Sequence, residues 1–392
     1  CRLMPTRIPR QDSRASLEQN IELEECYMEQ KTVCTGVVGA GAISDIYLKN
    51  MITRFDNLSV RSICAAHIES ARKKAQTYGI QAVTVKEMFD DPEIRLIVNL
   101  TPAPAHYGII REALEHGKHV YTEKTLTDDI DRSGELVRLA REKGLYLGSA
   151  PDTFLGSALQ TARSAVDSGL LGEIHSFAVS ANRNNDILLS ISEFLRQPGG
   201  GIVCDYAVYY VTALVSLLGP VARVGSIVGY PYPSHLNRVP GTPLFGQVMD
   251  TPNESQVNAI LQMENGVTGT LHIDADSVTE DQAYFTIYGT GGILFLTDPN
   301  QFGGEVRFLP VESESGKKAE PYVLPAVNEY SGNSRGIGPS DLADTILNGT
   351  PLRPSAERAY HVHEVLSAML RGGTSGAFTD IRSSCTRPEP FI

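Results

Sequence analysis

The chain has 392 residues, which is too long for one ordinary domain and suits two. Its 34 basic and 46 acidic side chains give a net charge of −12, so we expect neither nucleic acid nor an anionic membrane surface as a partner. No apolar run reaches the roughly 18 residues of a membrane span. Six cysteines without a C-x-x-C pair favour a reduced, cytoplasmic protein.

Residues 1–31 differ in composition from the rest of the chain. Four arginines precede an acidic run, and the apolar core of a secretory signal is missing. We expect this segment to be a poorly packed tail, within which Met28 is an alternative natural start.

Between residues 32 and 150, strand-like and helix-like segments alternate with short connections. Strands are expected at 31–41, 58–66, 94–102, 118–124 and 145–150, among others, and helices at 43–55, 69–79, 106–117 and 129–144. This alternation predicts an α/β domain with a doubly wound parallel sheet of six strands, the Rossmann arrangement.

Residues 151–392 follow a different pattern. Consecutive strands succeed one another after a helix at 205–218, with hairpin turns at 265–266 and 289–292. The pattern predicts an α+β domain with a large, mostly antiparallel open sheet. No downstream helix is left to cover the second face of this sheet. We therefore expect a homodimer or homotetramer that packs sheet to sheet.

A glycine-rich segment, GAGAIS, lies between the first strand and the first helix. Gly39 permits a tight turn, and Gly41 lets the backbone approach a pyrophosphate. Ala42 and Ile43 open the helix whose N-terminus attracts that anion. Ser44 stands where the dinucleotide fingerprint has Gly or Ala. The position between strand and helix predicts a dinucleotide site.

The residues at the ribose end of this site do not distinguish NAD from NADP as the cofactor. NAD-preferring folds place an acid at the end of the second strand. Here Ala65 lies at that end, and the first carboxylate is that of Glu69. His67 suits either a 2′-hydroxyl or a 2′-phosphate, or is simply solvated.

Two further motifs lie downstream. Glu123 and Lys124 follow the fifth strand, at the carboxyl edge where such sheets bind ligands. Three glycines at 199–201 precede Asp205 and Tyr209. Together with GAGAIS, these motifs resemble the Gfo/Idh/MocA oxidoreductases, whose members carry an E-K-P turn and a G-G-G-x-x-x-D-x-x-x-H or -Y signature.

The resemblance covers residues 32–385 and implies an NAD(P)-dependent oxidoreductase that acts on a secondary alcohol or ketone of a sugar, inositol or related polyol. It implies that Lys124 is the catalytic lysine, that Asp205 is the acid of the signature and that Tyr209 transfers the proton. The cofactor contacts expected from the loop and the resemblance are Gly39, Gly41, Ala42, Ile43, Ala65, Thr101, Pro102, His106, Glu123 and Lys124.

Two positions depart from the family pattern. Thr125 replaces the proline of the E-K-P turn, so the conformation of the Lys124 side chain does not follow from the family pattern. Residues 186–197 lack the aromatic and polar side chains expected of sugar-binding relatives, which bears on the substrate.

The expected chemistry is transfer of a hydroxyl proton during hydride transfer. A free tyrosine titrates near ~10, so we expect Lys124 and an oxidised nicotinamide to lower the pKa of Tyr209. Lys124 would also stabilise charge on the reacting oxygen. Asp205 lies one helical turn before Tyr209 and orients Lys124 or the substrate. The alternatives are a helix N-cap for Asp205 and a packing role for Tyr209 and Tyr210.

For several other polar side chains we expect structural roles. His106 is a helix-start residue in the alternative reading, His361 and His363 lie in the last helix, and Asp152 is a hinge or a cap at the domain junction. The acidic cluster at 272–281 lacks a second His or Cys at ligand spacing, so we expect a solvated strand end and no metal.

Two other functions stay open as alternatives. A cofactor-retaining glycosidase or lyase would use transient oxidation and would turn over without added NAD(P). A non-catalytic NAD(P)-sensing regulator would bind the cofactor and a protein partner. Such a regulator has no use for Lys124, Asp205 and Tyr209 together.

Overall fold

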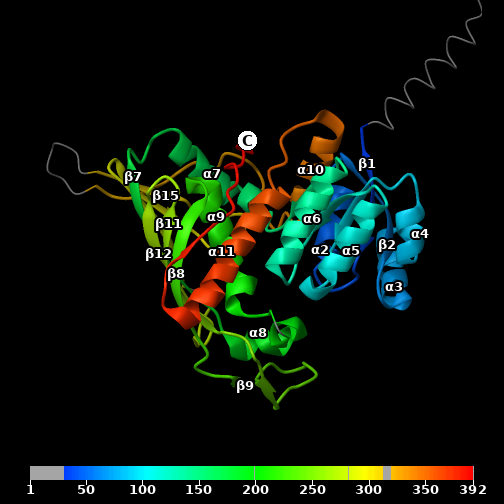
Figure 1. The fold of residues 1–392 in the computed structure, drawn as a ribbon, viewed down its shortest axis with the longest axis horizontal. Coiled ribbons are helices and arrows are strands. Elements are labelled where there is room, and N and C mark those ends of the chain that lie inside the picture. Colours follow the sequence, from blue (N-terminus) through cyan, green and yellow to red (C-terminus); the bar gives the residue numbers. More distant parts are fainter. Residues whose placement is uncertain (1–30, 198, 281, 312–318, 392) are drawn as a thin grey trace, which may run out of the picture.

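The computed structural model describes residues 31–197, 199–280, 282–311 and 319–391. The tail expected at 1–31, including Met28, lies outside these residues except for Lys31. The described chain forms a six-stranded sheet and a nine-stranded sheet at opposite ends of the molecule, with α9 (Val208–Leu218) and α11 (Ala356–Ser375) between them (Figure 1).

The six-stranded sheet is parallel throughout, in the order β3-β2-β1-β4-β5-β6, as the alternating pattern predicts. Its strands are β1 (Val33–Val38), β2 (Leu58–Cys64), β3 (Gln81–Ala82), β4 (Leu96–Asn99), β5 (His119–Thr122) and β6 (Leu147–Ser149). Its helices are α2 (Ser44–Thr53), α3 (Ile68–Tyr78), α4 (Val85–Asp90), α5 (Ala103–Glu115) and α6 (Ile130–Glu142). The strand order reverses between β1 and β4, and such a switch point opens a ligand crevice at the carboxyl edge.

Local sequence explains why these elements begin where they do. β4 is buried along its whole length, so Leu96, Ile97 and Val98 form a continuous apolar run instead of an alternating one. Thr84 and Glu87 form a capping box at the start of α4. The Asp129 carboxylate accepts the first backbone N–H groups of α6.

The nine-stranded sheet has the order β16-β15-β14-β13-β7-β12-β11-β8-β17. Neighbouring strands are antiparallel except for β7 and β12, which run parallel, so the mostly antiparallel sheet is confirmed. The strands are β7 (Ile174–Asn182), β8 (Val221–Gly229), β11 (Gln256–Met263), β12 (Thr268–Asp274), β13 (Ala283–Gly289), β14 (Gly292–Leu296), β15 (Arg307–Pro310), β16 (Tyr322–Val323) and β17 (Thr379–Asp380). Buried and exposed residues alternate along β8, β11 and β12, so one face packs inward and the other faces outward.

The second half of the chain also contains several helices and turns. They are α7 (Ser157–Asp167), α8 (Asn185–Ile191), the π-helix η3 (Val203–Ala207) that runs into α9, α10 (Ile337–Asn348), α11, and the 3-10 turns η1 (Thr153–Leu155) and η2 (Glu193–Arg196). A small ribbon of β9 (Ser234–Leu236) and β10 (Val248–Asp250) packs beside α8. No helix among the residues described combines the length and apolarity needed to cross a membrane.

One segment of the second half returns to the first sheet. α10 contacts α2 and the strands β1, β2, β5 and β6. Asn50 of α2 donates its side-chain amide to the backbone carbonyls of Asn333 (2.9 Å) and Arg335 (2.8 Å). Asn57 bonds in the same way to Ser340 (2.9 Å). The residues just before and within α10 are thus held by the Rossmann half of the chain.

Candidate active site

The phosphate loop has the backbone that a dinucleotide needs. Gly39 has a φ of 111° and donates its N–H to the Cys64 carbonyl (2.8 Å), and a Cβ here would lie 2.8 Å from the Leu100 backbone. Gly41 differs, because a Cβ at this position would meet no atom within 4 Å. The protein itself therefore does not require glycine at 41. A pyrophosphate that approaches the backbone at this point does require it, so the loop fits the cofactor.

The other expected cofactor contacts gather along the same carboxyl edge. Ala42 is exposed at the start of α2, and Ile43 is half-buried beside it. Ala65 follows the last residue of β2 and is half-buried. Thr101 and Pro102 follow β4, where Pro102 precedes the first residue of α5. The fold thus brings these residues, which are up to 60 positions apart in the chain, to one edge of one sheet.

His106 has a different place from the one expected of a cofactor contact. It is completely buried in α5, and both ring nitrogens lie close to backbone carbonyls: Nε2 is 2.7 Å from Thr101 O and Nδ1 is 2.8 Å from Thr125 O. Burial lowers the pKa of His106, with these carbonyls opposing the change. Because both ring nitrogens lie within hydrogen-bond distance of these carbonyls, the ring ties the loop after β4 to the turn after β5.

The turn after β5 is fixed by Glu123. Its carboxylate accepts the Tyr47 hydroxyl (2.7 Å) and the backbone N–H of Lys124 (3.1 Å). The Lys124–Thr125 peptide bond is cis, and the Thr125 hydroxyl donates to the Thr127 carbonyl (2.7 Å). Glu123, expected as a cofactor contact, therefore uses its carboxylate to position the residue that follows it.

Lys124 forms a half-buried ion pair with Asp205. Its Nζ lies 2.7 Å from Asp205 Oδ1 and also donates to the Asp205 backbone carbonyl (2.9 Å). Burial alone would lower the pKa of Lys124, but Asp205 and Tyr209 raise it above its ordinary value. The structure thus brings Lys124 and Asp205 into direct contact from the two halves of the chain. Lys124 is a fixed cation at neutral pH.

The glycines before Asp205 make room for a side chain that the sequence did not reveal. Glu254 accepts the backbone N–H of Val203 (3.0 Å), and its carboxylate lies 2.2 Å from where a Cβ on Gly201 would stand. A Cβ on Gly200 would lie 2.5 Å from the Phe194 carbonyl. Asp205 lies inside η3, so the alternative that it is the N-cap is wrong; Glu254 supplies the capping bond. Nothing local could identify Glu254, because it lies about fifty residues away.

Tyr209 faces the ion pair. It is 8% exposed, and its ring centroid lies 5.5 Å from Lys124 Nζ. Tyr210 points instead into the core, where it packs on Phe285 and Tyr206. Burial raises the pKa of Tyr209, and Lys124 opposes the rise without cancelling it. Lys124 thus acts in the expected direction, but without a bound nicotinamide the loss of hydration outweighs its charge and the pKa of Tyr209 is raised.

Arg335 is the second residue that sequence reasoning missed. Its Nη2 lies 3.5 Å from Tyr209 Oη and 3.0 Å from Asn300 Oδ1, and it precedes α10. The buried Asp152 carboxylate accepts the N–H groups of Gly336 (3.2 Å) and Gly338 (3.1 Å), which fixes the start of α10. The cap alternative for Asp152 thus agrees with the structure.

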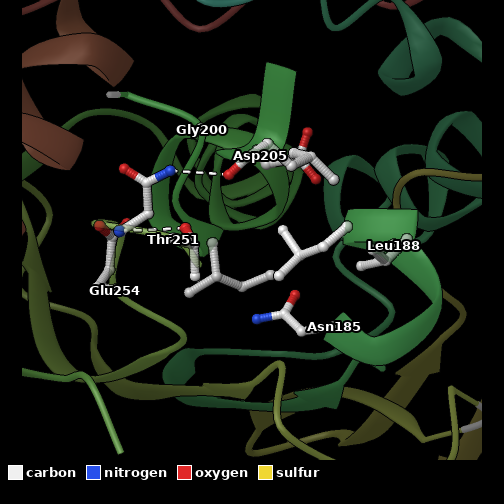
Figure 2. A pocket seen from close by; sticks show the side chains of 10 residues that line it. Asn185, Leu188, Gly200, Asp205, Thr251 and Glu254 are labelled. Carbon is white, nitrogen blue, oxygen red and sulfur yellow. Dashed lines mark hydrogen bonds between the residues drawn. The ribbon is translucent and has the colours of Figure 1, made fainter. Parts of the chain in front are cut away.

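A small pocket adjoins Asp205 (Figure 2). Asn185 and Leu188 of α8 line one side, and Thr251 and Glu254 line another (Figure 2). Leu189, Leu195 and Ile202 complete an apolar part of the lining. Three leucines of the segment 186–197 therefore lie beside Asp205.

The polar residues expected to be structural have varied surroundings. His361 is buried, with Nε2 accepting the N–H of Val221 (2.9 Å), and His363 Nδ1 lies 2.9 Å from Ser133 Oγ. Asp276 is not solvated as expected: its carboxylate is buried and accepts the Ser255 hydroxyl (2.6 Å). Within the described ranges, no group of three or more His, Cys, Asp or Glu side chains is arranged to hold a metal ion.

Comparison with known proteins agrees with this geometry. Residues 33–150 match the model of the oxidoreductase family with an NAD-binding Rossmann fold, and residues 159–295 match the GFO/IDH/MocA C-terminal domain. The chain is 25% identical over 343 residues to the dTDP-3,4-didehydro-2,6-dideoxy-alpha-D-glucose 3-reductase of Streptomyces violaceoruber, covering 84% of this chain and 96% of that protein. It is 22% identical over 328 residues to the scyllo-inositol 2-dehydrogenase (NAD(+)) of Bacillus subtilis, covering 83% and 89%.

Among solved structures, the apo form of levoglucosan dehydrogenase superposes with a TM-score of 0.79 at 19% identity, covering 91% of this chain and 100% of that one. The two models of one family match the two parts of the chain in order. The chain belongs to the GFO/IDH/MocA family of oxidoreductases, with an NAD-binding Rossmann domain at its N-terminal side.

Proposed function

We propose that the protein is an NAD(P)-dependent dehydrogenase or reductase acting on a secondary alcohol or ketone of a sugar, inositol or related polyol. The observation that carries this proposal is the contact between Lys124 and Asp205 (2.7 Å) beside Tyr209, at the carboxyl edge that also holds the phosphate loop. The names of the relatives, a sugar reductase and an inositol dehydrogenase, support the polyol class.

Each of the three residues has a distinct part in this chemistry. Bound nicotinamide supplies the hydride acceptor for oxidation or the hydride donor for reduction. Tyr209 Oη accepts the hydroxyl proton in oxidation and returns it in reduction. Lys124 Nζ donates to the reacting oxygen and stabilises negative charge there, while Asp205 holds the ammonium in place.

The substrate screen should extend beyond unmodified sugars. One relative is named as a reductase of a 2,6-dideoxy sugar. Deoxy sugars therefore belong in the screen beside unmodified sugars and glycosides.

The decisive experiment is a dehydrogenase screen of sugars, deoxy sugars, glycosides and inositols, with NAD and NADP in parallel. We expect cofactor reduction that depends on both substrate and added cofactor. Turnover without added cofactor would favour the cofactor-retaining glycosidase or lyase instead. Tight cofactor binding without turnover of any polyol would favour the sensing regulator.

The choice between NAD and NADP belongs to the same screen. The half-buried Ala65 follows β2, and the exposed His67 precedes α3. Glu69, the first carboxylate, is exposed and bonds to Arg72 (2.6 Å). This end of the site offers no buried acid near β2 among the described residues, so we propose that both cofactors be treated as candidates.

We also propose an assembly, a location and a domain division. Ile227, Ile260 and Tyr284 are 65%, 51% and 66% exposed on the outer face of the nine-stranded sheet, which favours a homodimer or homotetramer packed through that face. A monomer in sedimentation at micromolar concentration would exclude this assembly. The proposed location is the cytoplasm. The proposed division is a cofactor domain at 32–150 and a substrate and oligomerisation domain at 151–392.

A further inference from the structure

Arg335 presents a positive charge to the proton-transfer residue. One of its terminal nitrogens, Nη2, lies 3.5 Å from Tyr209 Oη and 3.0 Å from Asn300 Oδ1, and the other, Nη1, lies 3.1 Å from Asn333 Oδ1. An N–H of the guanidinium therefore points at the atom that would gain and lose the proton.

The other hydrogen-bond partners of this guanidinium carry no charge, and the carboxylates of Glu123 and Asp152 act on it through space without forming an ion pair. Among the ion pairs of the described residues, none includes Arg335, and both asparagine partners are uncharged amides. Its carbon centre also lies 5.8 Å from the Phe302 ring centroid. A half-buried cation without a carboxylate partner exerts a stronger field on its neighbours than a paired one.

Two anchors hold Arg335 toward Tyr209. Asn50 of α2 binds its backbone carbonyl at 2.8 Å, and Asp152 binds the next turn through Gly336 and Gly338. One anchor comes from the Rossmann half and the other from the junction between the halves. The backbone from which the Arg335 side chain extends is thus held in place beside Tyr209.

The charged groups around Tyr209 differ in how they are compensated. Lys124 approaches from the turn after β5, but its charge is paired with Asp205 at 2.7 Å. Glu123 and Asp205 act on Tyr209 as negative charges, and both raise its pKa. Arg335 approaches from the start of α10 and, like Lys124, opposes that rise. Arg335 is therefore the cation near Tyr209 that has no ion-pair partner among the residues described.

We propose that Arg335 is a further catalytic residue, which donates a hydrogen bond to Tyr209 Oη and stabilises the phenolate during proton transfer. In reduction the phenolic proton moves from Tyr209 to the substrate oxygen, and in oxidation it returns. Arg335 keeps all its protons in both directions. This inference rests on the proposed function, since it takes Tyr209 as the proton-transfer group.

The test follows the ionisation of Tyr209 directly. The chain has 16 tyrosines, so the ultraviolet tyrosinate titration of the full-length chain is measured with and without Tyr209→Phe, and the difference isolates Tyr209. The same pair is measured in an Arg335→Met background. We expect the apparent pKa of Tyr209 to rise by about one to three units, which is a tenfold to thousandfold loss of phenolate at a given pH.

Arg54→Met is the matched control. Arg54 donates to Ser334 Oγ (3.1 Å), so it touches the same loop, but it reaches outward over the Tyr330 ring. This variant should leave the titration of Tyr209 unchanged. If Arg335→Met does not fold, the titration of Tyr209 is measured in Arg335→Gln instead, since this variant is neutral and keeps a polar group that can bond to Asn300. A folded neutral variant with an unchanged Tyr209 titration overturns the proposal.

A kinetic measurement separates this inference from the proposed function. With the polyol found in the screen, the rising limb of the oxidation rate against pH should move to higher pH in Arg335→Met by the same amount as the titration. If Tyr209→Phe keeps full turnover, the proposed function is wrong, whatever the titration shows. If Tyr209→Phe loses turnover while Arg335→Met leaves both the limb and the titration in place, only the role of Arg335 is wrong.

Discussion

The phosphate loop and the proton-transfer site are built in different ways. The loop is made of backbone within one strand–turn–helix unit. It requires the absence of a side chain at Gly39 and at Gly41, two residues apart. The proton-transfer site is made of side chains from distant segments: Lys124 after β5, Tyr209 on α9 and Arg335 before α10. A local sequence motif can encode the first. The second exists only after the two halves have folded together.

This difference separates two kinds of damage. A substitution in the loop should affect cofactor binding through one contact and leave the rest intact. A substitution in the proton-transfer site should affect a group of coupled residues, so effects there should not add.

The largest effect is expected at Gly41. A Cβ at this position meets no protein atom within 4 Å, while a Val side chain would occupy the space through which a pyrophosphate approaches the backbone. Gly41→Val should abolish measurable NADH binding in calorimetry with an unchanged melting temperature. Gly39→Ala is the contrast, because its Cβ would meet the Leu100 backbone at 2.8 Å and should lower the melting temperature. An unchanged affinity of Gly41→Val for NADH would show that this loop does not bind the cofactor.

The next effect is expected at Tyr209. Tyr209→Phe should retain nucleotide affinity and lose about 10²–10⁴ in turnover, because the proton-transfer group is gone. Lys124→Ala should cost at least as much, and the double variant should be little worse than Lys124→Ala, since the two act as a unit. Steady-state rates of the three variants at one pH are sufficient. Multiplicative losses would show that Lys124 and Tyr209 act independently.

A pH effect on stability is expected at Asp152. The residue is 1% exposed, and burial raises its pKa to about 6 against the bonds from Gly336 and Gly338. A raised carboxyl pKa means that the folded protein binds the proton more tightly than the unfolded chain. This contribution to stability is therefore complete below about pH 4 and is lost as the pH rises through about 6.

Urea unfolding at a series of pH values tests this expectation. The free energy of unfolding of the wild type should fall over that window by up to about 3 kcal/mol relative to Asp152→Asn, which has no titrating group there. Parallel curves for the two proteins would mean that Asp152 is ionised with an ordinary pKa.

The smallest effect is expected at Gly201. Its Cβ would stand 2.2 Å from the Glu254 carboxylate, so Gly201→Ala should destabilise the protein by about 1–3 kcal/mol. In a Glu254→Ala background the same change should cost much less, because the clash is gone. Gly108→Ala, which meets no atom within 4 Å, is the control and should not destabilise. Equal costs of Gly201→Ala in both backgrounds would refute the role assigned to Glu254.

Sequence reasoning was sufficient where a requirement is local. The period of β1 to β6 and the hairpin turns predict both sheets, and the glycines predict the loop. It identified Lys124, Asp205 and Tyr209 through family motifs. It missed Arg335 and Glu254, since each acts on a residue at least fifty positions away and neither lies in a motif. It predicted the direction in which Lys124 acts on the pKa of Tyr209 but not the larger, opposite effect of burial, because the loss of hydration depends on packed surroundings that no spacing reveals.

The attachment of α10 to the first sheet bears on how such a protein can be recombined. Asn50 and Asn57 belong to the cofactor half by sequence, yet they bind Arg335 and Ser340 of the other half. Exchange of residues 32–150 for a foreign cofactor domain would replace both asparagines and release the loop that carries Arg335. A chimera designed for a new cofactor should therefore keep asparagine at positions 50 and 57, because these side chains of the cofactor half hold the loop that places Arg335 beside Tyr209.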